Sequence, residues 1–191
     1  MELQHVNVKL FLEKPKNVDL DAVIPVFHAW VQDQVCEELL IDVADYRHLD
    51  SGPGVILIGH EADYSLDLAG QRLGVRYNRK APLEGTNQDR LTQATRAALN
   101  AFHRLAADPR LTGQYSFNGT ELELFINDRM LVPNREETFE ALRPELETFF
   151  RKLYGGNGFS LGYGGDPRNL FSVAVKASRS FAAEVLLKNL S

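Results

Sequence analysis

Residues 158–162 read Gly-Phe-Ser-Leu-Gly, the Gly-x-Ser-x-Gly pattern that surrounds the nucleophilic serine of many hydrolases. In those enzymes a strand leads into the serine, a helix leads out, and the catalytic histidine follows later in the chain. Here glycines flank Ser160 on both sides, and all five histidines precede it. A differently ordered triad stays open, because triads are defined by geometry. The segment is interpreted as a short strand or flexible hairpin, and a hydrolase that uses Ser160 is the least favoured function.

His60, Tyr64, Tyr77 and Arg79 form the second candidate site. Strand alternation places His60 and Tyr64 on one face, and the facing strand brings Tyr77 and Arg79 to the same side. Where an apolar face gives way to polar groups, they could bind a small anionic or aromatic ligand, with Arg79 as a bidentate donor. The sole tryptophan, Trp30, could line this pocket or anchor an interface. The alternative is that all five side chains are structural.

Metal and cofactor chemistry finds little support in the sequence. Residues 60–63, His-Glu-Ala-Asp, resemble a metal cluster, but the pleat of a strand separates the histidine from the two acids. No His-Glu-x-x-His motif or cysteine-rich ligand spacing occurs. The only cysteine, Cys36, has no basic neighbour in sequence that would lower its pKa. The sequence therefore predicts no metal, no cofactor and an inert thiol.

A hairpin around Gly70-Gln71 is the best-defined element that could position these residues. A glycine in the first central position is typical of a type II′ turn. The resulting register places Tyr64 opposite Tyr77 and Leu66 opposite Val75. A single strand over 55–69 would be unusually long, so we expect a bend or bulge at Gly59 to divide it.

The remaining pattern predicts a series of strands and amphipathic helices. Alternation indicates strands near 6–12, 39–43, 121–126 and 170–176, and apolar stripes indicate four helices. Thr86 and Asp89 resemble a capping box at the start of the second helix, and Asn134 is the expected cap of the third.

These elements predict an α+β fold in which mostly antiparallel strands, in one sheet or two related sheets, are covered by about four helices. We expect a single domain over 1–191, with two pseudo-equivalent halves of about 1–110 and 111–191. A duplicated β-α-β-β layout is similar in element order to that of GyrI-like small-molecule-sensing domains. The likeness carries no functional residues.

The composition excludes several classes of protein. A net charge of −5 without a basic arm disfavours nucleic-acid binding. The longest apolar runs are only a few residues, too short to span a membrane. A single cysteine and no recognisable signal peptide predict a cytoplasmic protein.

Three functions follow as hypotheses. The favoured one is a small-molecule-binding or sensing module with the ligand near His60, Tyr64, Tyr77 and Arg79. The alternative is a homo-oligomeric interaction or assembly protein that associates through an exposed patch or sheet edge. The third is a hydrolase that uses Ser160 or His60.

Overall fold

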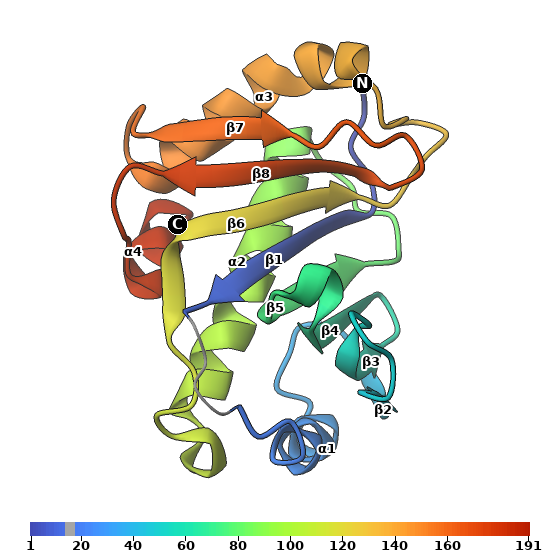
Figure 1. Cartoon of the computed structure of the whole chain (residues 1–191), viewed down its shortest axis with the longest axis vertical. Coiled ribbons are helices and arrows are strands. Elements are labelled where there is room, and N and C mark those ends of the chain that lie inside the picture. The colour runs from blue at the N-terminus through green and yellow to red at the C-terminus, as the bar shows by residue number, and fades with distance from the viewer. Residues whose placement is uncertain (14–17) are drawn as a thin grey trace.

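The computed structural model describes residues 1–13 and 18–191, and its strands form one antiparallel sheet in the order β2-β3-β4-β5-β1-β6-β8-β7 (Figure 1). The strands are β1 (Val6–Leu12), β2 (Leu40–Tyr46), β3 (Gly54–Gly59), β4 (Ala62–Asp67), β5 (Gly74–Arg79), β6 (Phe117–Ile126), β7 (Phe159–Tyr163) and β8 (Phe171–Ala177). The helices are α1 (Val23–Asp33), α2 (Asn87–Ala107), α3 (Glu136–Tyr154) and α4 (Ala183–Asn189), with short 3-10 turns η1 (Ala69–Gln71) and η2 (Pro109–Leu111). The α+β prediction is confirmed.

The sheet order is symmetric about the central β1–β6 pair. The succession β1-α1, then β4-β5-α2, has the same arrangement as β6-α3, then β7-β8-α4, and β5 and β8 flank the central pair in equivalent positions. The first half carries β2 and β3 as an additional hairpin at the edge. Each helix buries one apolar stripe, as the sequence periodicity predicts.

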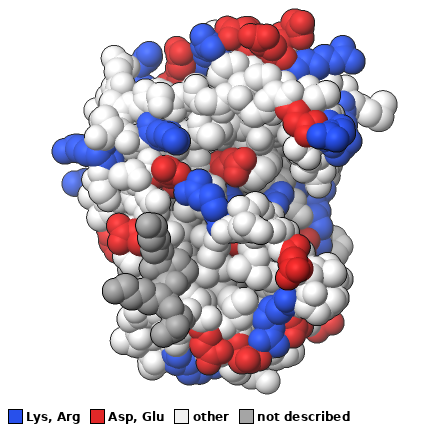
Figure 2. All heavy atoms as spheres, in the orientation of Figure 1, with Lys and Arg blue, Asp and Glu red and all other residues white. Residues whose placement is uncertain are grey.

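The helices pack on the sheet face that carries Val8, Leu10, Leu57 and Leu66, and these residues join one hydrophobic core. Figure 1 shows α2 crossing behind the central strands. The opposite face is turned toward the viewer in Figure 2, where charged side chains of both signs lie in the middle of the face as well as along its borders.

A buried ion pair lies on that second face. The Lys9 ammonium is 2.5 Å from the Asp67 carboxylate and donates to the Ala69 carbonyl at 2.8 Å, and both charged side chains are only 2% exposed. Arg76 lies 3.5 Å from the other Asp67 oxygen. Burial lowers the pKa of Lys9, and the neighbouring Asp67 opposes that shift.

The predicted register of the β4–β5 hairpin is confirmed. Tyr64 pairs with Tyr77 and Leu66 with Val75. The turn itself differs from the prediction, because pairing stops before it and residues 68–73 form a longer connection. Gly70 and Gln71 both have positive φ angles (69° and 57°), whereas a type II′ turn needs a negative value at its second position.

The prediction that Gly59 divides residues 55–69 is confirmed, but a full reversal of the chain divides them and not a bend or a bulge. The chain reverses at His60-Glu61, and β3 pairs antiparallel with β4. A Cβ atom on Gly59 would lie 2.4 Å from the Ala62 carbonyl oxygen, so this tight reversal needs glycine. As a consequence, His60 lies in a turn and not on the strand that carries Tyr64.

The helix starts show one correct and one incorrect prediction. Thr86 and Asp89 form the predicted reciprocal capping box at the start of α2. The N-cap of α3 is Arg135, one residue after the predicted Asn134. The Asn134 amide donates instead to the Asp166 carbonyl at 2.6 Å, so a long-range contact takes the side chain that a local cap would use.

Candidate functional site

A buried carboxylate lies where the connection after α1 meets the helix-covered face of the sheet. Glu38 is 5% exposed and accepts hydrogen bonds from the hydroxyls of Tyr64 (2.6 Å) and Tyr77 (2.7 Å). The Gln93 side-chain amide, on α2, lies 3.3 Å from the oxygen that Tyr77 contacts. Buried carboxylates are costly unless donors surround them, and three donors from two strands and one helix meet this requirement.

The β4–β5 register explains why the donors converge. Tyr64 and Tyr77 are directly opposed, and their rings meet edge to face with centroids 5.1 Å apart. Arg79 lies two residues beyond Tyr77 on the same face, and its guanidinium is 3.9 Å from the Glu38 carboxylate. It also donates to the Ala81 carbonyl at 2.9 Å, which fixes the side chain beside the pair of tyrosines.

Both tyrosines are hydrogen-bond donors throughout the physiological pH range. Burial raises the pKa of Tyr64 and of Tyr77 well above the ordinary value, and the Glu38 carboxylate reinforces the shift in both. Neither hydroxyl is therefore poised to exchange a proton near neutral pH. The two hydroxyls therefore serve as hydrogen-bond donors to the Glu38 carboxylate.

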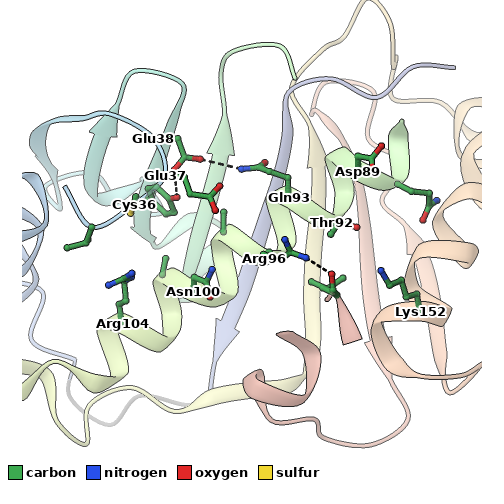
Figure 3. A pocket seen from close by; sticks show the side chains of 16 residues that line it. Cys36, Glu37, Glu38, Asp89, Thr92, Gln93, Arg96, Asn100, Arg104 and Lys152 are labelled. Carbon is green, nitrogen blue, oxygen red and sulfur yellow. Dashed lines mark hydrogen bonds between the residues drawn. The ribbon is translucent and has the colours of Figure 1, made fainter. Parts of the chain in front are cut away.

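A pocket of about 520 Å³ opens beside this cluster. We call it the α2 trough: the solvent-facing side of α2 forms its floor, residues 35–38 form one wall, and Lys152 and Leu190 form the other (Figure 3). Glu38 and Tyr64 belong to its lining, so the buried cluster forms part of one wall.

Three basic side chains line the trough. Figure 3 shows Arg104 on the side of Cys36, Lys152 on the opposite side and Arg96 between them. Arg96 donates to the Leu190 carbonyl. Within residues 1–13 and 18–191, none of the three basic groups has a carboxylate within ion-pair distance. The trough thus holds three basic groups without a direct ion pair in the described chain, although Glu37, Glu38 and Asp89 also line it.

The Cys36 thiol also lines the trough, but it is not activated. Burial raises its pKa to about 11, and the nearby Glu38 charge adds to the shift. The thiol is therefore protonated at neutral pH and is a poor nucleophile or metal ligand.

The structure brings together three of the five predicted ligand residues. Tyr64, Tyr77 and Arg79 surround Glu38, although only Tyr64 lines the trough. His60 is apart from them, since its ring is 69% exposed and lies 3.2 Å from the Glu61 carboxylate. Trp30 is buried in the core against Phe27, with ring centroids 5.5 Å apart.

Ser160 lies on the edge strand β7 opposite Lys176, and its side chain is exposed. The strand is followed by a loop and then β8, so the helix of a nucleophile elbow does not follow. In the part of the chain that the structure describes, no hydrogen bond joins Ser160 to a histidine. The geometry gives the serine no general base.

Sequence reasoning missed the residues that define the trough. Glu38 stands in an ordinary Cys-Glu-Glu-Leu-Leu run that resembles an exposed turn. Arg96 and Arg104 recur at helical spacing on the polar side of α2, a pattern that equally describes a solvated surface. Their spacing on one face was the only available signal.

Comparison of the chain with protein-family models, curated proteins and solved structures found no match. Among the described residues, no group of three or more His, Cys, Asp or Glu side chains is arranged to hold a metal ion. The helices of the described segments are each too short or too polar to cross a membrane.

Proposed function

We propose that this protein binds a small anionic molecule in the α2 trough. The observation that carries the proposal is the convergence of Arg96, Arg104 and Lys152 on one hollow without a carboxylate partner in the described chain. The chain has a net charge of −5, whereas basic and acidic side chains are equal in number in the lining of the trough. Glu37, Glu38 and Asp89 also line the trough, so the proposal rests on the three basic groups that are not paired with these acids and can attract an anion locally.

The spacing of the basic groups favours a ligand with more than one acidic or polar group. Arg96 and Arg104 are eight residues apart on α2, about 12 Å along the helix axis at the usual rise per residue. Thr92 and Asn100 lie on the same floor and offer hydrogen-bonding groups. Guanidinium groups bind carboxylates and phosphates bidentately, so either acid class fits this floor.

The buried Glu38 cluster supports the proposal by holding one wall in place. A ligand that enters a preformed pocket loses less free energy to ordering of the protein. The pocket wall built by Tyr64 is fixed by its hydrogen bond to Glu38 and by its contact with Tyr77.

The proposal is tested by calorimetric titration of the full chain with sodium citrate and, separately, inorganic phosphate, at constant ionic strength. We expect saturable binding of at least one probe. Replacing Arg96 and Arg104 together with glutamine should weaken it by about tenfold or more, because each removes a charge-assisted contact. Arg168→Gln is the matched control, since Arg168 is 88% exposed, pairs with Asp166 and lies outside the trough.

Equal binding by the control and the double variant would contradict the proposal. The absence of a binding heat for both probes would also contradict it. Native mass spectrometry of the purified protein provides a second readout, because a retained ligand adds a mass that denaturation removes. The cytoplasmic location stays a prediction that rests on the single cysteine.

A further inference from the structure

The sheet has two edge strands, β2 and β7, and they are protected very differently. An edge strand presents unpaired backbone N–H and C=O groups to which another strand can bond. Natural proteins usually block such edges with side chains, charges or bulges. A comparison of the two edges therefore shows where this sheet can accept a further strand.

Side chains occupy the β2 edge. The Gln34 amide donates to the Leu40 carbonyl at 2.9 Å and accepts from the Leu40 N–H at 3.0 Å, so it replaces a neighbouring strand. The Asp42 carboxylate accepts from the N–H of Val43 at 2.8 Å. A register shift between Leu40 and Asp42 further interrupts this strand. The first half of the β2 edge, residues 40–43, is therefore closed to pairing.

The β7 edge has no such protection. The Ser178 N–H donates to the Gly158 carbonyl at 2.8 Å, which sets the alternation of the β7–β8 ladder. Gly158 is thus in a hydrogen-bonded pair, and every second residue after it repeats this arrangement. Leu161 and Tyr163 are three and five residues further on, in non-hydrogen-bonded pairs, so their N–H and C=O groups point away from β8. Within residues 1–13 and 18–191, no hydrogen bond from outside the β7–β8 ladder reaches either backbone.

A hollow of about 420 Å³ runs between this edge and α3. Figure 1 shows α3 beside β7 at the end of the sheet. The half-buried side chains of Phe159 and Leu161 line it on the strand side. On the helix side, Arg143, Glu147 and Arg151 follow one another at four-residue intervals, which places them in one row on the helix.

The charge order in this row is its own complement. Arg143 pairs with Glu140 at 2.7 Å and Arg151 donates to Asn157 at 2.7 Å, so neither is bonded to the Glu147 between them. The order Arg-Glu-Arg is the same in both directions along the helix. When two such rows run antiparallel and one is displaced by one helical turn, the glutamate of each row faces an arginine of the other row. Two arginine–glutamate pairs result.

We propose that two copies of this chain associate through β7 about a two-fold axis, so that one antiparallel sheet continues across both. With Leu161 opposite the partner's Leu161, each leucine N–H donates to the other's carbonyl, and each Tyr163 N–H donates to the partner's Phe159 carbonyl. The two α3 helices then lie side by side, and the Arg-Glu-Arg rows face each other. This is an isologous interface, the commonest kind in dimers.

Sedimentation equilibrium of the full chain over a wide concentration range tests the proposal. We expect the wild type to reach twice the chain mass and Leu161→Pro to stay at the chain mass. The Leu161 N–H has no partner within the described chain, so proline at this edge position removes a bond only from the interface. Val43→Pro is the matched change on the protected β2 edge and should leave association unchanged.

Charge reversal distinguishes a second copy from any other strand donor. Glu147→Arg places only arginines in the row and should weaken association by about tenfold or more. Adding Arg143→Glu and Arg151→Glu to that variant reverses every sign, and self-association should return. A wild type that stays monomeric overturns the proposal, and so does a Leu161→Pro protein that remains dimeric or a triple variant that remains monomeric. Circular dichroism of each variant establishes that it is folded.

Discussion

The two oxygens of the Glu38 carboxylate have different numbers of donors, and this asymmetry predicts unequal effects of two similar substitutions. Among the residues that the structure describes, one oxygen accepts only from Tyr64, at 2.6 Å. The other accepts from Tyr77 at 2.7 Å and from Gln93 at 3.3 Å, with the Arg79 guanidinium 3.9 Å away. Tyr64→Phe therefore leaves one charged oxygen without a donor from the described chain, whereas Tyr77→Phe does not.

The expected magnitudes follow from the value of hydrogen bonds to buried charges. Either substitution keeps the aromatic ring and removes one hydroxyl, so little packing is lost. A hydrogen bond to a charged group contributes about 1.5–3 kcal/mol, and an unsatisfied buried charge costs more than a partly satisfied one. We expect Tyr64→Phe to lower the free energy of unfolding by about 2–3 kcal/mol and Tyr77→Phe by about 1 kcal/mol.

Urea unfolding followed by the fluorescence of Trp30 measures both effects, because this sole tryptophan is only 6% exposed in the folded chain. Glu38→Gln supplies a double-mutant cycle: once the charge is gone, Tyr64→Phe should cost about 1–2 kcal/mol less than in the wild type. An equal or larger effect of Tyr77→Phe would refute the donor assignment. So would a Tyr64→Phe cost that Glu38→Gln leaves unchanged.

Two further predictions concern the sheet and the core. Lys9→Met should lower the free energy of unfolding by about 3 kcal/mol, because the buried Asp67 carboxylate loses its closest charge partner and keeps only Arg76 at 3.5 Å and the Ala69 N–H at 2.9 Å, and adding Asp67→Leu should recover part of the loss. Urea unfolding of the single and double variants checks this, and a double variant no more stable than the single one would contradict it. Burial raises the pKa of Tyr154 above its unfolded value, so its contribution to stability is complete below about pH 10 and is lost at higher pH. Between about pH 9 and pH 11, Tyr154→Phe should therefore lose about 1.4 kcal/mol less stability than the wild type, and equal losses in urea melts at the two pH values would count against a raised pKa.

The parts of the fold that were predicted from the sequence depend on neighbouring residues. The facing of Tyr64 and Tyr77 follows from side-chain alternation on either side of one turn, and a single residue of slippage would move both sets to the wrong face. The capping box of Thr86 and Asp89 is likewise made within one turn of helix. The residues in each of these contacts are close together in the sequence, so the local residue pattern is sufficient to predict the contact.

Errors appeared where a contact in the folded chain overrode the expected local conformation. Gly59 was expected to bend a strand, but the close approach of Ala62 makes it the start of a reversal. Asn134 was expected to cap α3, but it bonds across to Asp166. The residue type does not identify the contact in either case, because a glycine or an asparagine is compatible with several turns.

The candidate site divides in the same way. Alternation alone placed Tyr64, Tyr77 and Arg79 on one side of a hairpin, because strand periodicity and register are properties of adjacent residues. Only the tertiary structure brought Glu38 into contact with both hydroxyls, set Lys152 across the trough from Arg104, and left β7 at the edge of the sheet. These arrangements depend on the order of strands and on how helices far apart in sequence pack over them, and packing is decided by the burial of the whole core and not by any one segment.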